Sequence, residues 1–305
     1  MSGVLHPAGP QAQAIADIGW VLILGGTLIF AGVMLLLARS LRRRADAVDT
    51  RRWLLGGGIV FPGVVLVALL AWSLAHAPPW KPVPPADALV ISVHGRMWWW
   101  EVRYRDPATG ADIRTANEIR IPVGRPVYLA LSSEDVIHSF WVPQLGGKTD
   151  MVPGRLQHLL LAADRAGTYR GQCAEFCGEQ HARMALHVVA APREDFDAWL
   201  AAQARPATPP ATARQAAGRE AFLARRCDAC HTVRGVTGDS RLGPDLTHVG
   251  SRLHLGAGTL PNDAAARAHW IAHVQQAKPG ARMPSSPQLD AATLEAMADW
   301  LGSLR

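Results

Sequence analysis

The chain has 305 residues, of which 49% are hydrophobic, enough for more than one domain with its own core. Its formal net charge is +6, a balance found in many nucleic-acid-binding proteins. The arginines, however, gather in one short segment between two apolar runs, so we attribute the charge to membrane topology and expect no nucleic-acid partner.

The two apolar runs, residues 18–38 and 53–75, contain no charged side chain. Each reaches the about 20 residues needed to cross a bilayer, and together they predict two transmembrane helices; a helical hairpin buried in a soluble protein is the alternative. The positive-inside rule places the segment between them in the cytoplasm and both termini outside. The arginines on which this depends are Arg39, Arg42, Arg43, Arg44, Arg51 and Arg52.

The residues before the first run lack the basic and apolar parts of a signal peptide. We therefore expect that the first helix is its own insertion signal, or that the chain is a processed form.

Prolines dominate residues 76–85, which predicts an irregular linker leaving the membrane. Short apolar and β-branched runs follow, with turn residues between them, and predict a β-sandwich or barrel. The expected strands are residues 88–94, 98–104, 119–123, 127–131, 156–162, 168–170 and 185–190. In the second of these, Trp98 and Trp100 should share one face and Trp99 the other.

Residues 171–184 bring together two thiols, an imidazole and a thioether: Cys173, Cys177, His181 and Met184. Such soft and borderline ligands favour copper over magnesium or calcium. Two thiolates four residues apart suit two bridged copper ions, each of which needs a terminal nitrogen. The second nitrogen must come from elsewhere, and His138 is the candidate. A Cys173–Cys177 disulfide is the alternative in an oxidising compartment.

Residues 192–200 begin with acidic residues and carry an apolar stripe, which predicts an amphipathic helix closing this domain. A Pro/Ala/Thr tether of extended, semi-rigid character follows at residues 204–214. A second domain should begin at about Gln215.

The second domain opens with Cys227-Asp-Ala-Cys230-His231, a haem c attachment motif in which two thiols form thioethers and the histidine binds iron. Met283, followed by proline, offers the thioether of a His/Met-ligated cytochrome c. Zinc binding and bis-histidine ligation are the alternatives, the latter through His248, His254, His269 or His273. We expect His187 to be no ligand, and Met297 to belong to the core-facing stripe of a last helix at residues 290–304.

The copper-type loop and His138 resemble cytochrome c oxidase subunit II, and residues from about Gln215 onward resemble a class I cytochrome c. The combination is typical of subunit II of a caa-type haem-copper oxidase. The resemblance implies a cupredoxin fold and a binuclear copper (CuA) centre. Its implied ligands are bridging Cys173 and Cys177, terminal His138 and His181, axial Met184 and the Glu175 carbonyl; the Glu175 side chain would also reach a magnesium ion shared with subunit I.

The resemblance further implies that Trp98 lies over the copper site and admits electrons. The expected route runs from an external donor, either a soluble cytochrome c or a quinol–cytochrome c reductase, through haem c to copper and then to haem a of subunit I, where oxygen is reduced and protons are pumped. Subunit III is a further expected partner, and the lipid bilayer surrounds the hairpin. The alternatives are the electron-entry subunit of a nitric oxide reductase and a membrane-anchored copper-delivery protein.

The expected organisation is an all-β copper domain and an all-α cytochrome c domain carried by a membrane hairpin. Both metal domains should lie on the periplasmic side of a bacterial-type inner membrane. The expected boundaries are an external segment at residues 1–17, the hairpin at 18–76, the cupredoxin domain at 77–203, the linker at 204–214 and the cytochrome c domain at 215–305.

Overall fold

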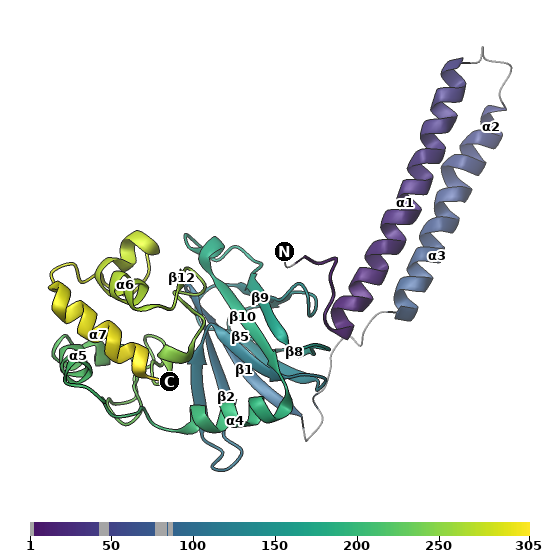
Figure 1. Ribbon diagram of the computed structural model, residues 1–305. Helices are drawn as coiled ribbons and strands as arrows, with labels where there is room; N and C mark the ends of the chain where they lie inside the picture. Colours follow the sequence, from purple (N-terminus) through teal and green to yellow (C-terminus); the bar gives the residue numbers. More distant parts are fainter. Residues whose placement is uncertain (1–2, 43–48, 77–83, 85–87) are drawn as a thin grey trace.

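The computed structural model describes residues 3–42, 49–76, 84 and 88–305 (Figure 1). Arg43 and Arg44 lie outside the described residues, as does most of the proline-rich linker expected at residues 76–85. Two long helices project from a body in which a β-sandwich and a smaller helical unit lie side by side.

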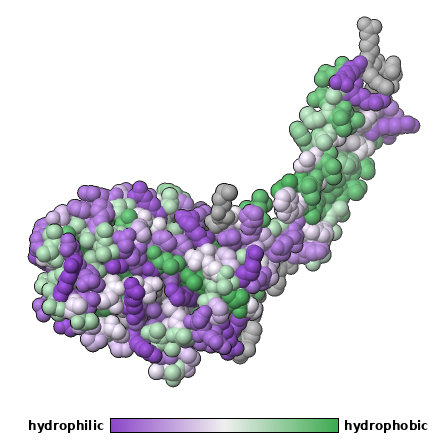
Figure 2. Space-filling model, viewed as in Figure 1, coloured by the Kyte–Doolittle hydropathy of each residue, from purple (hydrophilic) through white to green (hydrophobic). Residues whose placement is uncertain are grey.

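The two apolar runs form the two projecting helices. The first is α1, Pro10–Arg42; the second spans Thr50–His76 as α2 (Thr50–Arg52), a π-helical stretch η1 (Trp53–Val60) and α3 (Phe61–His76). Their apolar windows are 0% buried, and Figure 2 shows a hydrophobic arm with hydrophilic residues at its far end. A helical hairpin buried in a soluble protein would hide these side chains, so the exposure favours the membrane interpretation.

The helix α1 begins at Pro10, ahead of the apolar run, and its first turns contact the sandwich. Ala8 donates its N–H to the Gln144 carbonyl at 2.8 Å, and its own carbonyl accepts the Asp164 N–H at 2.8 Å. Ala12 and Ala16 are buried beyond it. Small side chains thus let the base of the membrane helix lie directly on the β-domain.

The sandwich domain, residues 88–204, consists of two five-stranded sheets with the orders β3-β2-β1-β5-β8 and β4-β10-β9-β6-β7. The pairs β1/β5 and β10/β4 are parallel and the others antiparallel. The strands are β1 (Leu89–Arg96), β2 (Trp99–Arg105), β3 (Asp112–Ala116), β4 (Glu118–Pro122), β5 (Val127–Ser133), β6 (His138–Trp141), β7 (Thr149–Met151), β8 (Gln157–Leu161), β9 (Gly167–Cys173) and β10 (Ala185–Ala191). A 3-10 turn, η2 (His181–Arg183), precedes β10, and helix α4 (Arg193–Ala204) closes the domain.

The core lies between the two sheets and is lined by alternate residues of each strand, as expected for a sandwich. Trp100 is fully buried and packs edge-on against Phe140. Trp98 precedes β2 instead of beginning it, so the predicted strand starts one residue too early. It still packs against the core, whereas Trp99 lies under the Arg96 guanidinium, which agrees with the predicted alternation.

The C-terminal domain, residues 213–305, has a separate core around Phe222, Met297 and Trp300. Met297 is therefore a core residue, as predicted. The elements are α5 (Ala213–Ala224), the 3-10 turns η3 (Cys227–Ala229) and η4 (Val249–Ser251), the hairpin β11 (His254–Leu255) and β12 (Leu260–Pro261), α6 (Ala264–Ala277) and α7 (Ala291–Ser303). Neither α6 nor the small hairpin was expected from the sequence.

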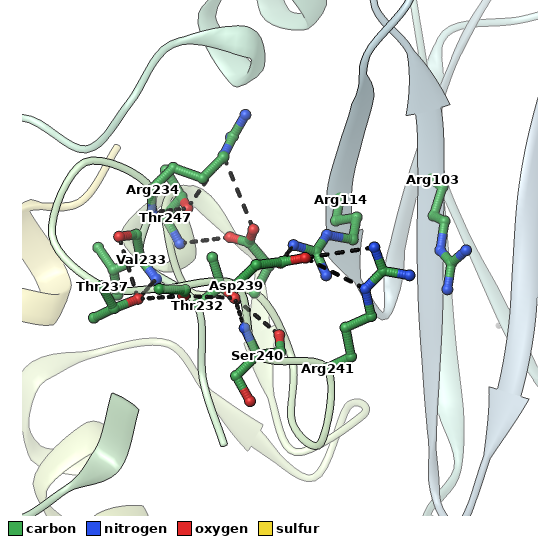
Figure 3. Close-up of polar contacts among 12 residues, drawn as sticks. Arg103, Arg114, Thr232, Val233, Arg234, Thr237, Asp239, Ser240, Arg241 and Thr247 are labelled. Carbon is green, nitrogen blue, oxygen red and sulfur yellow. Dashed lines mark hydrogen bonds and ion pairs between the residues drawn. The ribbon is translucent and has the colours of Figure 1, made fainter. Parts of the chain in front are cut away.

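The segment joining the two domains is held against the C-terminal domain. The Ala207 N–H donates to the Arg234 carbonyl at 2.8 Å, and His248 Nε2 contacts the Arg205 carbonyl at 3.0 Å. Arg234 also pairs with Thr247, and Arg114 of β3 pairs with Asp239 across the domain boundary (Figure 3). The two domains therefore form a packed pair.

The small hairpin meets the sandwich at a pair of histidines. The rings of His187 and His254 stack with centroids 4.4 Å apart and planes at 12°. Burial, together with the nearby His254 and Arg170, lowers the pKa of His187 from 6.5 to about 4. Between pH 4 and pH 6.5, His187 therefore binds fewer protons in the folded protein than in the unfolded chain.

We predict that the stability contributed by this stack is complete above pH 6.5 and declines as the pH falls toward 4. His187→Gln should remove that part of the acid sensitivity, whereas the matched variant of the exposed His158 on β8, His158→Gln, should keep it. Thermal unfolding of the full chain at pH 7 and pH 5 measures the difference. Equal acid sensitivity in wild type and His187→Gln would contradict the prediction.

Candidate metal centres

Two strand ends and one loop form the first candidate centre. His138 begins β6 and Cys173 ends β9, which are neighbours in one sheet. The Ala174 N–H donates to the Ser139 carbonyl at 2.9 Å, and the Cys173 N–H donates to the Met184 carbonyl at 2.9 Å. These two bonds fold residues 174–184, here called the copper loop, back over the strand ends.

The loop brings together all the side chains that the sequence analysis singled out for copper. The two sulfurs, Cys173 Sγ and Cys177 Sγ, lie 3.7 Å apart, and both cysteines are free. A disulfide needs sulfurs about 2.05 Å apart, so the disulfide alternative does not describe this arrangement. The remaining distances are 4.0 Å from Cys173 Sγ to His138 Nδ1, 3.7 Å from Cys177 Sγ to His181 Nδ1, 3.8 Å from Cys177 Sγ to Met184 Sδ and 3.1 Å from Cys173 Sγ to the Glu175 carbonyl oxygen.

This donor set fits copper. His138, Cys173 and Cys177 are buried, and their ligand atoms lie within 4.8 Å of one another. Two sulfurs lie side by side, each with an imidazole nitrogen and a weaker donor close to it, and together they offer soft and borderline ligands in a buried pocket. These residues would hold copper.

Two residues that the sequence analysis did not single out position His138. Asp135 Oδ1 lies 2.8 Å from His138 Nε2, so Nε2 carries the proton and Nδ1 is left to face the sulfurs. A Cβ on Gly95 would lie 2.7 Å from His138 Cδ2, so only glycine leaves room for the ring. The position of Asp135, three residues before His138, was the available sequence signal.

The two thiols of the site shift each other's pKa in opposite directions. The hydrogen bond between Cys173 Sγ and Cys177 Sγ lowers the pKa of Cys173 to about 3, although burial opposes this shift. The same bond and burial raise the pKa of Cys177. Both thiols must lose their protons to serve as thiolate ligands, so metal binding at this site would release protons.

The Glu175 side chain is partly exposed. Its carboxylate meets Lys148 Nζ at 3.2 Å, and the same ammonium group lies 3.1 Å from Asp150. Asp150 also accepts the Ser139 hydroxyl hydrogen at 2.8 Å, which ties this surface cluster to the strand that carries His138. The carboxylates of Glu175 and Asp150 therefore lie at the surface, on and beside the copper loop.

Trp98 contacts the copper loop directly. Its indole Nε1 donates to the Cys177 carbonyl at 2.8 Å. Gly178 has a φ of +109°, and a Cβ there would lie 3.2 Å from the Trp98 ring. The indole therefore rests on the loop through a close approach that only glycine permits.

The second candidate centre is the Cys227–His231 turn. Cys227 starts η3, Cys230 is exposed, and both thiols are free. His231 Nδ1 donates to the Pro244 carbonyl at 2.8 Å, and burial lowers the pKa of His231, so Nε2 is left unprotonated as a ligand. A Cβ on Gly243 would lie 2.6 Å from the ring, which shows how closely this loop covers the histidine. The donor set fits covalently attached haem.

Met283 lies half-buried in the loop between α6 and α7. Among the competing histidines, His248 is buried with Nε2 on the Arg205 carbonyl, and His254 stacks on His187. His269 and His273 lie against each other on α6. Met283 as the sixth ligand stays a prediction.

Two family models match the chain: "Cytochrome C oxidase subunit II, periplasmic domain" over residues 107–191 and "Cytochrome c" over residues 215–305. A cytochrome c oxidase subunit 2 of Alkalihalophilus pseudofirmus is 34% identical and aligns with 99% of this chain and 90% of its own length. The chain belongs to the cytochrome c oxidase subunit II family.

Further relatives and a solved structure are similar to this chain. A cytochrome c oxidase subunit 2 of Bacillus subtilis is 30% identical over 79% of this chain and 70% of its own length. A quinol oxidase subunit 2 of the same species is 31% identical over 65% of each. The crystal structure of the periplasmic domain of subunit II of cytochrome oxidase from Bradyrhizobium japonicum is 30% identical over 40% of this chain and 97% of that chain, with a TM-score of 0.37. For this family member, the subunit II domain implies copper and the cytochrome c domain implies haem.

Asp135→Asn tests the support of His138. The amide keeps the shape but gives Nε2 a weaker acceptor, so we expect copper affinity to fall on the order of 10- to 100-fold. Copper retained by the full chain during dialysis against a chelator measures the loss. Asp112→Asn, a matched change at an exposed aspartate of β3 in the other sheet, should retain wild-type affinity, and an equal loss in both variants would contradict the role of Asp135.

Proposed function

We propose that this chain is the electron-entry subunit of a terminal respiratory cytochrome c oxidase. Electrons pass from an external donor through the chain's own haem c to its binuclear copper centre, and from there to haem a of subunit I for oxygen reduction coupled to proton pumping. The observation that carries the proposal is the pair of free, buried sulfurs 3.7 Å apart with His138 Nδ1 and His181 Nδ1 beside them. When bound, the haem and the copper pair each accept and release one electron at a time.

The chain's own side chains hold these groups rigidly. In the copper site the proposed roles are bridging for Cys173 and Cys177, terminal for His138 and His181, and axial for Met184 and the Glu175 carbonyl. A buried site whose histidine is fixed by Asp135 changes its geometry little with redox state, and this favours fast electron transfer. The thiols of Cys227 and Cys230 would attach the haem, with His231 and Met283 as its axial ligands.

The surface beside the copper loop suits a large apolar partner. Phe176, in the copper loop, is 75% exposed, and Ile137, directly before His138, is 43% exposed. Such an exposed apolar group marks a protein interface. We assign this face to subunit I, with the Glu175 carboxylate reaching a shared magnesium ion, and we expect subunit III in the same complex.

The hairpin sets the topology. Arg39 and Arg42 lie in the last turn of α1, and Arg51 and Arg52 lie in α2. Both of these helix ends are far from the sandwich (Figure 1). The positive-inside rule assigns that end to the cytoplasm. Both metal domains then face the periplasmic side of a bacterial-type inner membrane, where a soluble cytochrome c or a quinol–cytochrome c reductase delivers electrons.

Cys173→Ser tests the copper centre. The variant should lose both copper ions, because one sulfur cannot bridge the pair, while haem attachment is retained. Copper and iron per chain, with the mixed-valence spectrum of wild type as reference, measure the result. A single labile Cu(I) in wild type would instead indicate copper delivery. The haem type of the co-purifying partner, with oxygen and nitric oxide uptake, separates an oxidase from a nitric oxide reductase.

Met283→Ala tests the haem ligand set. The haem should stay attached through Cys227 and Cys230, but the thioether-to-iron absorption band at the red end of the spectrum should disappear. Met297→Leu is the matched control, because Met297 is buried in the core and should leave the band unchanged. Survival of the band in Met283→Ala would assign the sixth ligand to another residue.

A further inference from the structure

Lys278 lies at the boundary between the two domains and is only 3% exposed. It ends α6, at the start of the loop that leads to Met283. Its Nζ donates to the carbonyl oxygens of Trp98 at 2.7 Å, Arg183 at 2.8 Å and Gly256 at 3.0 Å. Trp98 and Arg183 belong to the sandwich domain. The Lys278 side chain therefore joins the Met283 loop to Trp98, the proposed electron-entry residue, and to Arg183 at the end of the copper loop.

The contact is a built site for an ammonium group. Three acceptors use all three N–H groups of the charged form, which a neutral amine cannot supply. Among the described residues, no carboxylate is within ion-pair distance of Nζ, so the three carbonyl dipoles face the charge directly. Burial lowers the pKa of Lys278 to about 7, although the nearby Cys177 favours the charged form. Enclosing a lysine in this way is costly unless every donor is satisfied, which makes the geometry of the contact specific.

The loop beyond Lys278 lies directly on Trp98. Gly280 has a φ of +74°, and a Cβ there would lie 2.6 Å from a Glu179 carboxylate oxygen and 3.5 Å from the Trp98 ring. Trp98 in turn donates to the Cys177 carbonyl. The path from the Met283 loop to a copper-loop cysteine therefore runs through Lys278, Gly280 and Trp98 in continuous contact.

A second contact closes the same boundary from the opposite direction. Arg183 Nη1, on the sandwich domain, donates to the Ala277 carbonyl at 2.7 Å. Lys278 bonds the Arg183 carbonyl in return. The remaining boundary contacts lie on other elements, such as the Ala185 N–H to the Ala257 carbonyl at 3.0 Å and the Leu253 N–H to Glu118 at 3.0 Å.

We propose that Lys278 is a positioning residue for electron transfer: its ammonium group fixes the Met283 loop to the backbone of Trp98 and Arg183, and so holds the haem-bearing domain over the copper loop. This inference rests on the proposed function. It has a further consequence for the electron route, because the chain's own C-terminal domain covers Trp98. An external donor then delivers electrons to the haem and not to the copper centre directly.

The first test measures domain association without using electron flow. A protease site is placed at the exposed stretch around Thr208 and Pro209 in the full chain as purified, and association of the two parts after cleavage is followed by size-exclusion chromatography. Lys278→Met keeps the length of the side chain but removes the charge and the donors. The dissociation constant should rise roughly 100-fold, because several charged hydrogen bonds are lost.

Arg282→Met is the matched control, because Arg282 is an exposed cation on the same loop. It should leave association unchanged. Arg183→Met removes the reciprocal contact from the sandwich side and should raise the dissociation constant roughly tenfold. This variant tests the same boundary if Lys278→Met fails to fold. Wild-type association in Lys278→Met, or in Arg183→Met when the first variant does not fold, overturns the inference.

The second test measures positioning in the uncut chain. After light-triggered reduction of the haem, copper reduction should be slowed in Lys278→Met and unchanged in Arg282→Met, with haem and copper spectra as in wild type. An unchanged transfer rate despite weakened association overturns the positioning role. Absence of the copper pair or the haem from wild type would instead contradict the proposed function, and the association test would still report on Lys278.

Discussion

The structure depends on the closure of one loop over two strand ends. The bonds from Cys173 to Met184 and from Ala174 to Ser139 return the chain to the sheet within a few residues, and this return brings both sulfurs to one point. The rest of the centre follows from where β6 begins and β9 ends. His138 enters because its strand pairs with β9, and Gly95 is required because the histidine ring occupies the space of a side chain on β1. The rigid sandwich therefore fixes the metal site, as expected for a site on the loops of a β-scaffold.

The sequence was sufficient for the chemistry and insufficient for the arrangement of the domains. Cys173, Cys177, His181 and Met184 are close in sequence, so a local motif reveals them, and the apolar runs reveal the hairpin by length alone. The sequence did not predict the strands β3, β6 and β7 or the helix α6. The strands β6 and β7 are too short to show a period, and in α6 polar and apolar residues are mixed on all sides of the helix, so no apolar face is visible. The role of Lys278 could not be predicted from the sequence, because its ammonium group donates to the backbone carbonyls of Trp98, Arg183 and Gly256. Every residue has a backbone carbonyl, so these partners cannot be recognised from their residue types.

The packed boundary changes how the fusion of the two domains is understood. A flexible tether raises the concentration of one domain near the other but leaves their orientation free. Here the tether lies on the C-terminal domain through Arg205 and Ala207, and the small hairpin stacks His254 on His187. The orientation is thus specified by the fold, and the hairpin β11–β12, an addition to the helices around the haem motif, serves as a docking element. The copper and haem motifs are separated in sequence but belong to one structural unit.

The junction at Ala8 has a mechanical consequence. The N–H and the carbonyl of Ala8 are both hydrogen-bonded to loops of the sandwich, and α1 starts two residues later. The β-domain is therefore attached rigidly to the start of the first membrane helix. Roughly eight residues of helix lie between Pro10 and the first apolar run, which at about 1.5 Å per residue gives a stand-off of about 12 Å. The length of this helical segment then sets the height of the copper loop above the bilayer. Lengthening or shortening that segment by one residue would also rotate the whole domain by about 100° around the helix axis.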